Sequence, residues 1–172
     1  TTLSALVLPH VPAATSDYAQ ADATIETGIG FGNANRPSDG LAIQYIVLHD
    51  TEESYLNTVR IFTDPDTCCT ANYVVDGTDT GYFPRVTQFV PESEVAYHAG
   101  NLYYNRHSIG IENVGFANAP NGYYTPAMYE TLAQLVASLC LKYAIPLDRA
   151  HILGHGNVPG PSADTIAQQH YD

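Results

Sequence analysis

The sequence predicts a single α/β domain in which helices flank a central mixed β-sheet. Three observations lead to this class. The chain has 172 residues, the length of one ordinary domain. Short apolar runs, typical of buried strands, recur along it. They alternate with stretches of helical periodicity, and alternating strands and helices are typical of α/β domains.

The first half of the chain divides into an arm and several short elements. Residues 1–40 are rich in Ala, Thr, Gly, Asn and Pro and have weak periodicity, so we expect an arm packed on a domain that spans 41–172. Regular structure is expected to begin near Leu41. The expected elements are a strand at 44–48, a short helix at 54–62, and strands at 71–76, within 81–91 and at 108–114.

The clearest helix is expected at residues 126–143. Thr125 can cap its first turn, and Pro126 suits the first helical position, where a missing N–H costs nothing. Its apolar stripe is assigned to core packing and consists of Met128, Leu132, Leu135, Val136, Leu139 and Tyr143. Ile145-Pro146 ends the helix. A last strand at 149–153 then leads to His155, and we expect the functional site at the carboxyl ends of the strands.

Charge and hydropathy exclude two classes of partner. The chain has six Lys and Arg residues and eighteen Asp and Glu residues, which gives a formal net charge of −12. Binding to a nucleic-acid backbone depends on clustered Lys and Arg, so we expect no nucleic-acid partner. No apolar run approaches the roughly 20 residues that a membrane-spanning helix needs, so no membrane span is expected.

The three cysteines, Cys68, Cys69 and Cys140, do not have the spacing of a CxxC metal site. Cys68 and Cys69 are expected to be too close to bond each other readily. Two alternatives stay open: a disulfide from one of them to Cys140 in an oxidising compartment, or three buried thiols. A chain that begins at Thr1 suits a mature secreted protein or an excised domain, and both readings stay open.

Two apolar runs end in a histidine, and the chain closes with a carboxylate. The runs are Ile46-Val-Leu-His49 and Ile152-Leu-Gly-His155, and the last residues are His170-Tyr171-Asp172. Two imidazoles and one carboxylate form a three-ligand zinc set that leaves one position open for water, as catalytic zinc sites do. We therefore predict that His49, His155 and Asp172 bind Zn²⁺ in a zinc hydrolase.

Glu112 is the candidate base of that site. Strand alternation places its carboxylate on the same face as Gly110 and across from Ile109 and Ile111. A carboxylate on an otherwise apolar strand is costly unless it is paired or faces a cleft, so its presence there indicates a function.

Five motifs in order along the chain resemble those of the zinc-dependent N-acetylmuramoyl-L-alanine amidases, the family that includes the peptidoglycan recognition proteins. The resemblance covers Leu41 to Asp172. The motifs are Ile46-Val-Leu-His-Asp-Thr51, Ala71-Asn-Tyr-Val-Val-Asp-Gly77, Ala96-Tyr-His-Ala-Gly-Asn101, Ser108-Ile-Gly-Ile-Glu112 and Ile152-Leu-Gly-His155.

The resemblance implies a role for each further site residue. Glu112 would deprotonate a zinc-bound water and pass the proton to the leaving amine. Tyr73 would help to hold that water or the oxyanion, and His170 would stabilise the oxyanion. His98 and Asn101 would contact the muramyl sugar or the stem peptide.

The third zinc ligand has a rival. The family's third ligand is an Asp or Cys followed by Pro-Gly, and Asp172 is the last residue, so this pair cannot be compared. Asp164 has the spacing from His155 found in shorter family members, but Thr165-Ile166 follows it. Asp172 is the preferred ligand.

The resemblance implies a peptidoglycan hydrolase, which we expect to be a monomer. The cysteines and the absence of an initiator Met favour an extracytoplasmic setting. The hydrolase would cleave the amide bond between N-acetylmuramic acid and the L-alanine of the stem peptide. The alternative is a domain that binds muropeptides without cutting them, as superfamily members lacking a zinc ligand do.

Overall fold

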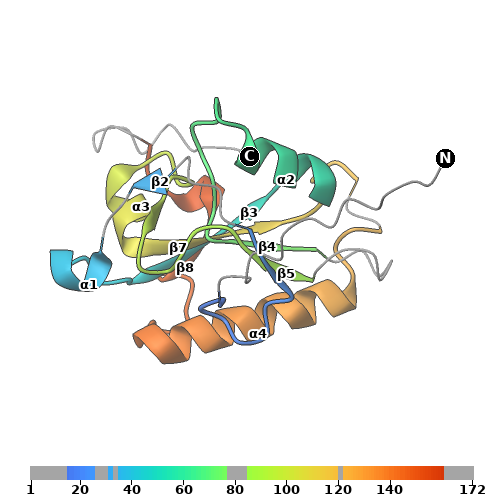
Figure 1. Cartoon of the computed structure of the whole chain (residues 1–172). Coiled ribbons are helices and arrows are strands. Elements are labelled where there is room, and N and C mark those ends of the chain that lie inside the picture. The colour runs from blue at the N-terminus through green and yellow to red at the C-terminus, as the bar shows by residue number, and fades with distance from the viewer. Residues whose placement is uncertain (1–14, 26–30, 33–34, 77–84, 120–121, 161–172) are drawn as a thin grey trace.

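A six-stranded mixed sheet forms the middle layer of the molecule, in the strand order β1-β5-β4-β7-β3-β8 (Figure 1). The computed structural model describes residues 15–25, 31–32, 35–76, 85–119 and 122–160. The strands of the sheet are β1 (Ala23–Thr24), β3 (Tyr45–Asp50), β4 (Tyr73–Val75), β5 (Val86–Gln88), β7 (Ser108–Asn113) and β8 (Ile152–Gly154). Only the β4–β5 pair is antiparallel among the paired strands of this sheet. Beside it, β2 (Phe31–Gly32) and β6 (Val95–Ala96) form an antiparallel pair.

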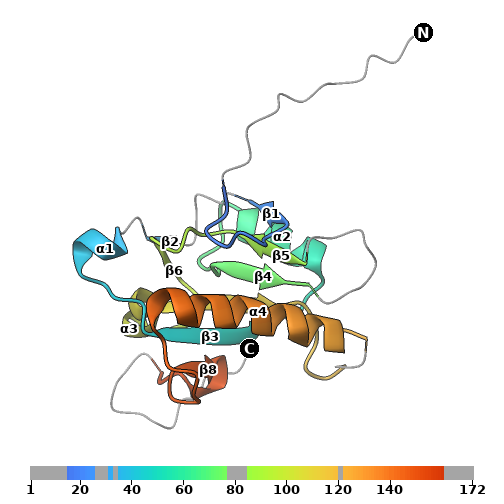
Figure 2. The ribbon, with the colours of Figure 1, turned by 90° about the horizontal axis from the view of Figure 1, so that it is seen from below.

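Helices cover both faces of the sheet. Helix α4 (Pro126–Tyr143) covers one face, and Figure 2, viewed from that side, shows it in front of the sheet and roughly along the direction of β3. Helices α2 (Tyr55–Thr63) and α3 (Leu102–His107) lie on the other face, together with the 3₁₀ helix η1 (His155–Asn157). The short helix α1 (Arg36–Asp39) lies at the side. The prediction of one α/β domain with a mixed central sheet between helices is confirmed.

Helix α4 forms where its sequence predicts. The Thr125 side chain accepts a hydrogen bond from the Met128 N–H at 3.2 Å, and Pro126 occupies the first turn. Met128, Leu135 and Leu139 are buried against the sheet. The helix ends at Ala144, whose φ of 54° is left-handed. The predicted bounds, cap and apolar stripe of this helix are therefore confirmed.

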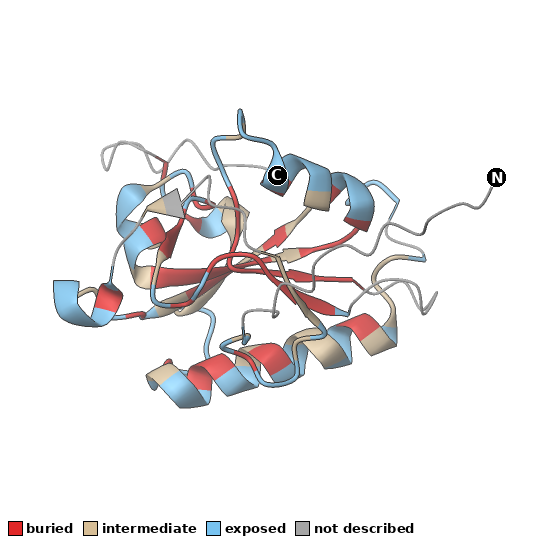
Figure 3. Ribbon diagram, in the orientation of Figure 1, coloured by how far each residue is buried: buried red, intermediate tan, exposed pale blue. Residues whose placement is uncertain are grey.

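Alternation along β7 sorts its side chains between the two faces. Ile109 and Ile111 belong to the core under α4, whereas Gly110 lies against the His98 ring on the opposite face. Figure 3 shows that the central strands are mostly buried. The face that Glu112 shares with Gly110 is thus the α2 and α3 face, as strand alternation predicts.

The expectation that regular structure begins near Leu41 is wrong. Strand β1 pairs in parallel with β5, with Ala23 opposite Thr87, and Tyr18 packs edge-on against Tyr73 at 6.5 Å between ring centroids. Two-residue strands such as β1 and β2 leave no periodic pattern in a sequence, so periodicity could not reveal them. Residues 1–14 of the predicted arm lie outside the described residues.

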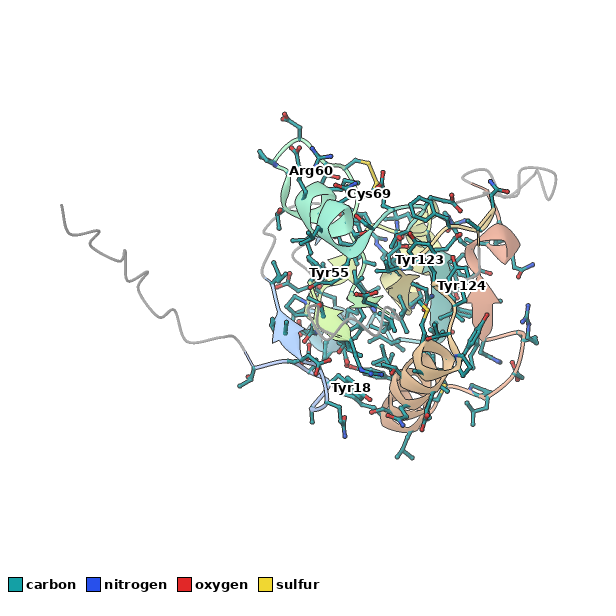
Figure 4. All side chains as sticks on the ribbon, turned by 90° about the vertical axis from the view of Figure 1, so that its right-hand side faces the viewer. Tyr18, Tyr55, Arg60, Cys69, Tyr123 and Tyr124 are labelled. Atoms are coloured by element: carbon teal, nitrogen blue, oxygen red, sulfur yellow. A yellow bond between two sulfur atoms is a disulfide. The ribbon has the colours of Figure 1, made fainter. Side chains whose placement is uncertain are left out.

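The expectations for Cys68 and Cys69 are also wrong, whereas Cys140 is a buried thiol as one alternative predicts. Cys68 and Cys69 form a disulfide with each other, and both are exposed (Figure 4). Cys140 is a buried free thiol in the core under α4. Cys140 belongs to α4 on one face of the sheet, whereas Cys68 and Cys69 follow α2, which lies on the other face (Figure 1).

In the part of the chain that the structure describes, no helix is both long and apolar enough to cross a membrane.

Candidate metal and catalytic site

His49 and Glu112 are directly opposite each other on two neighbouring strands. β3 and β7 run in parallel, and His49 pairs with Glu112 in their register, near the carboxyl end of each strand. Glu112 lines a small cavity of about 90 Å³ with Thr58 and Phe62 of α2. β7 lies between β4 and β3, so Glu112 is on a central strand and not on the edge of the sheet.

His155 reaches the same place from the other side of β3. Strand β8 pairs with β3 in parallel, with Gly154 opposite Leu48, and His155 follows as the first residue of η1. The ring centroids of His49 and His155 lie 4.5 Å apart. Three adjacent parallel strands thus bring together three of the predicted site residues, two imidazoles and one carboxylate.

The side chains of this site suit a zinc ion in part. Neighbouring imidazoles are nitrogen donors of the kind that zinc binds, and a carboxylate is a common third ligand. Among the described residues, no group of three metal-ligating side chains is complete. The predicted third ligand Asp172, its rival Asp164 and the predicted oxyanion donor His170 lie outside the described residues.

His98, which is predicted to contact substrate, contacts His49 directly in the structure. Its Nδ1 lies 3.0 Å from His49 Nε2, and its Nε2 lies 3.2 Å from Ser108 Oγ. The side chain is buried, with 9% exposed. Both ring nitrogens therefore contact protein atoms, and the His98 ring lies edge-on to the His49 ring with centroids 5.1 Å apart.

Asn101, which is also predicted to contact substrate, caps a helix in the structure. Its side-chain oxygen accepts hydrogen bonds from the Tyr103 and Tyr104 N–H groups at 2.9 and 3.3 Å and so caps α3. Its amide donates to the Pro159 carbonyl at 3.1 Å. These bonds tie the chain that follows η1 to the start of α3 and occupy the polar atoms of Asn101.

Tyr73 is on the wrong face for the role predicted for it. It pairs with Ile111, so its ring points with that residue into the core under α4, away from His49. Its hydroxyl donates a 2.5 Å hydrogen bond to the buried Glu92 carboxylate. Burial, and next the Glu92 charge, raise the pKa of Tyr73. We therefore withdraw Tyr73 from the site.

Two supporting residues were missed by the sequence reasoning. The Asn113 amide donates to the His49 carbonyl at 2.8 Å, and the Tyr124 hydroxyl donates to Asp50 Oδ2 at 3.3 Å. Burial, and next the Asp50 carboxylate, raise the pKa of Tyr124, so this phenol stays protonated and can donate. Tyr124 and Tyr123 lie on the loop before α4 (Figure 4). Gly115 was a sequence signal for Tyr124, because a Cβ added there would lie 2.8 Å from the Tyr124 ring.

Comparisons with known proteins show the family of this chain. The family model described as N-acetylmuramoyl-L-alanine amidase matches residues 39–172. N-acetylmuramoyl-L-alanine amidase A of Achromobacter lyticus is 32% identical over 100 residues, which cover 58% of this chain and 52% of that protein. The chain spans about half the length of the curated relatives it matches.

Solved structures give the same result. A mutant endolysin from Bacillus subtilis superposes with a TM-score of 0.57 at 26% identity, covering 78% of this chain and 84% of that one. The Escherichia coli amidase AmiD, in complex with the substrate anhydro-N-acetylmuramic acid-L-Ala-D-γ-Glu-L-Lys, superposes with a TM-score of 0.51 at 26% identity, covering 67% of this chain and 49% of that one.

Proposed function

We propose the function of this chain from one premise, that the chain belongs to the N-acetylmuramoyl-L-alanine amidase family. It hydrolyses the amide bond between N-acetylmuramic acid and the L-alanine of the peptidoglycan stem peptide. One observation carries this proposal: His49, His155 and Glu112 meet at the carboxyl ends of three adjacent parallel strands. The AmiD complex supports the choice of substrate, because its ligand joins a muramic acid to L-Ala.

His49 and His155 hold a zinc ion in this proposal, with Asp172 as third ligand and Asp164 as its rival. Bound zinc supplies a Lewis acid that polarises the scissile carbonyl and makes water nucleophilic near neutral pH. The two histidines suit this task because β3 and the turn from β8 into η1 hold the two imidazoles side by side before any ion binds.

Glu112 moves the proton. As the water oxygen bonds to the amide carbon, the Glu112 carboxylate accepts a proton from that water. The carbon–nitrogen bond then breaks, and Glu112 returns the proton to the amine of the departing L-alanine. The position of Glu112 across from His49 supports this role, because base and metal ligand then face the same reacting atoms. His170 stabilises the oxyanion in this scheme.

The setting of the reaction is part of the proposal. Peptidoglycan lies outside the cytoplasmic membrane, so the chain acts there, as a monomer. The exposed Cys68–Cys69 disulfide supports an oxidising, extracytoplasmic compartment.

Digestion of purified peptidoglycan tests the proposal. The zinc-loaded chain should release stem peptides that begin with L-alanine, identified by mass spectrometry, and Glu112→Gln should lower the rate by about 10²- to 10⁴-fold. Glu130→Gln is the matched control, because Glu130 is an exposed carboxylate of α4, and it should leave the rate unchanged. Zinc-loaded protein that binds peptidoglycan without cutting it would instead indicate a recognition domain.

The third ligand has its own test. Asp172→Asn and Asp164→Asn should be compared for zinc content after dialysis. We expect the first to lose zinc and the second to retain it, and the reverse result would move the ligand to Asp164.

A further inference from the structure

Three hydrogen bonds link His49 to a backbone carbonyl through buried side chains. His49 Nε2 lies 3.0 Å from His98 Nδ1, and His98 Nε2 lies 3.2 Å from Ser108 Oγ. Ser108 Oγ donates in turn to the Tyr104 carbonyl at 2.5 Å. His49, His98 and Ser108 are all buried, so water does not compete for these bonds.

The bond from Ser108 to the Tyr104 carbonyl determines which atom donates in each of the other two hydrogen bonds. A carbonyl oxygen can only accept, so the single hydroxyl proton of Ser108 goes to Tyr104. Ser108 Oγ must then accept from His98, which places the proton of the neutral His98 ring on Nε2. His98 Nδ1 is left as an acceptor, and His49 Nε2 must be the donor to it. The proton of the neutral His49 ring is therefore on Nε2.

We propose that Ser108 and His98 are positioning residues that set the tautomer of His49 and so make Nδ1 its metal-binding nitrogen. A neutral imidazole carries one proton, and only the other nitrogen offers a lone pair to a cation. Partners that hold the second nitrogen of a metal-binding histidine fix its tautomer and ring orientation. This inference rests on the proposed function only in taking His49 as a metal ligand.

The His98 ring packs directly on β7 because Gly110 has no side chain. A Cβ added at Gly110 would lie 2.5 Å from Cγ of His98, so the ring packs directly on the strand backbone. Asn105 accepts hydrogen bonds from the His98 and Ala99 N–H groups at 3.1 and 2.7 Å, which fixes the backbone of the same residue. His98 is thus held from both its ring and its main chain, as a residue that orients another must be.

Nitrogen NMR of the metal-free protein tests the tautomer directly. The full chain is labelled with ¹⁵N in its histidine rings, and two-bond ¹H–¹⁵N correlations distinguish the protonated nitrogen from the nitrogen with the lone pair. We expect His49 to be protonated at Nε2. A proton on Nδ1 of His49 overturns the inference, whether or not the chain cleaves peptidoglycan.

Two variants of His98 with the same shape test the effect on the metal. His98→Asn keeps an acceptor oxygen at the position of Nδ1, whereas His98→Leu replaces it with a methyl group. We expect His98→Leu to bind zinc about 10- to 100-fold more weakly than His98→Asn in competition with a chelator. Equal zinc affinities of the two variants would overturn the inference.

Ser108→Ala removes the hydroxyl at the other end of this hydrogen-bond series. We expect about a tenfold loss of zinc affinity and a mixture of His49 tautomers in the metal-free spectrum. Thr87→Val is the matched control, because it removes a buried hydroxyl that bonds Tyr55 away from the histidines, and it should change neither readout. A wild-type chain that binds no zinc would refute the proposed metal site, while the tautomer measurement would still decide the inference.

Discussion

Two polar clusters lie on opposite faces of the same sheet and differ in what surrounds their carboxylate. The Glu92 cluster lies under α4, where buried Glu92 accepts hydrogen bonds from Tyr73, Tyr143 and Lys142. The histidine cluster (His49, His98, Glu112 and His155) lies on the other face, at the strand ends. Protein donors from two elements surround the first carboxylate, whereas the second belongs to a residue that pairs with His49 and lines a cavity. The comparison separates a carboxylate that stabilises the fold from one placed for chemistry.

Neutralising the two carboxylates should give the largest difference in stability between the two clusters. Glu92→Gln leaves Lys142 and two phenols facing a neutral amide, so we expect the free energy of unfolding to fall by about 3 kcal/mol. Glu112→Gln should lower it by less than about 1 kcal/mol while amidase activity is lost. Urea unfolding of both variants measures the difference, and equal losses of stability would refute the distinction.

Overpacking should damage only the histidine cluster. In Gly110→Ala, the new methyl group would lie 2.5 Å from the His98 ring, so the ring must shift. We expect a loss of about 2 kcal/mol in stability together with weaker zinc binding. Gly154→Ala is the control, since the nearest atom would lie at 3.6 Å, and thermal unfolding should place it close to the wild type.

Tyr73→Phe tests whether Tyr73 acts in the Glu92 cluster or in catalysis. The variant removes one donor from the Glu92 carboxylate, and we expect a loss of about 1.5 kcal/mol in the free energy of unfolding. Amidase activity of the folded enzyme should be unchanged. A normal stability with a rate lowered a hundredfold would return Tyr73 to the catalytic site.

Alkaline pH should lower the free energy of unfolding through the Glu92 cluster, by less than the substitutions above. Burial and Glu92 raise the pKa of both Tyr73 and Tyr143 above the usual value of 10.0. Above about pH 10 the unfolded chain loses these protons and the folded chain retains them, so stability is present below that pH and falls above it. Tyr73→Phe should reduce this slope by about 1.4 kcal/mol per pH unit, measured by urea unfolding between pH 9 and pH 11. An unchanged slope would contradict the assignment.

Local sequence signals predicted the elements whose caps, apolar runs or alternation lie within a single segment. Thr125, Pro126 and a helical stripe gave α4 with its bounds, since caps and periodicity act within one segment. The apolar run before His49 gave β3, and alternation along β7 gave the face of Glu112 correctly. These signals need no knowledge of which strands are neighbours.

The errors in the candidate site arise where two segments meet. Whether Tyr73 faces the histidines depends on the register between β4 and β7, in which Tyr73 is opposite Ile111, and no local pattern states this register. The contact between His98 and His49 joins residues 49 positions apart and depends on the space that Gly110 leaves. The roles of Asp172, Asp164 and His170 stay predictions.

The edge position of β8 ties the site to the local stability of the sheet. This three-residue strand pairs with β3 alone among the described strands, whereas β3 and β7 have neighbours on both sides. Opening of such an edge costs less free energy than global unfolding and exposes its amides to hydrogen exchange. When β8 opens, His155 leaves His49 while His49 and Glu112 stay in register. A ligand held by both histidines therefore protects the amides of β8 as its concentration rises. Occupancy of the site and order at this edge of the sheet are two measures of one equilibrium.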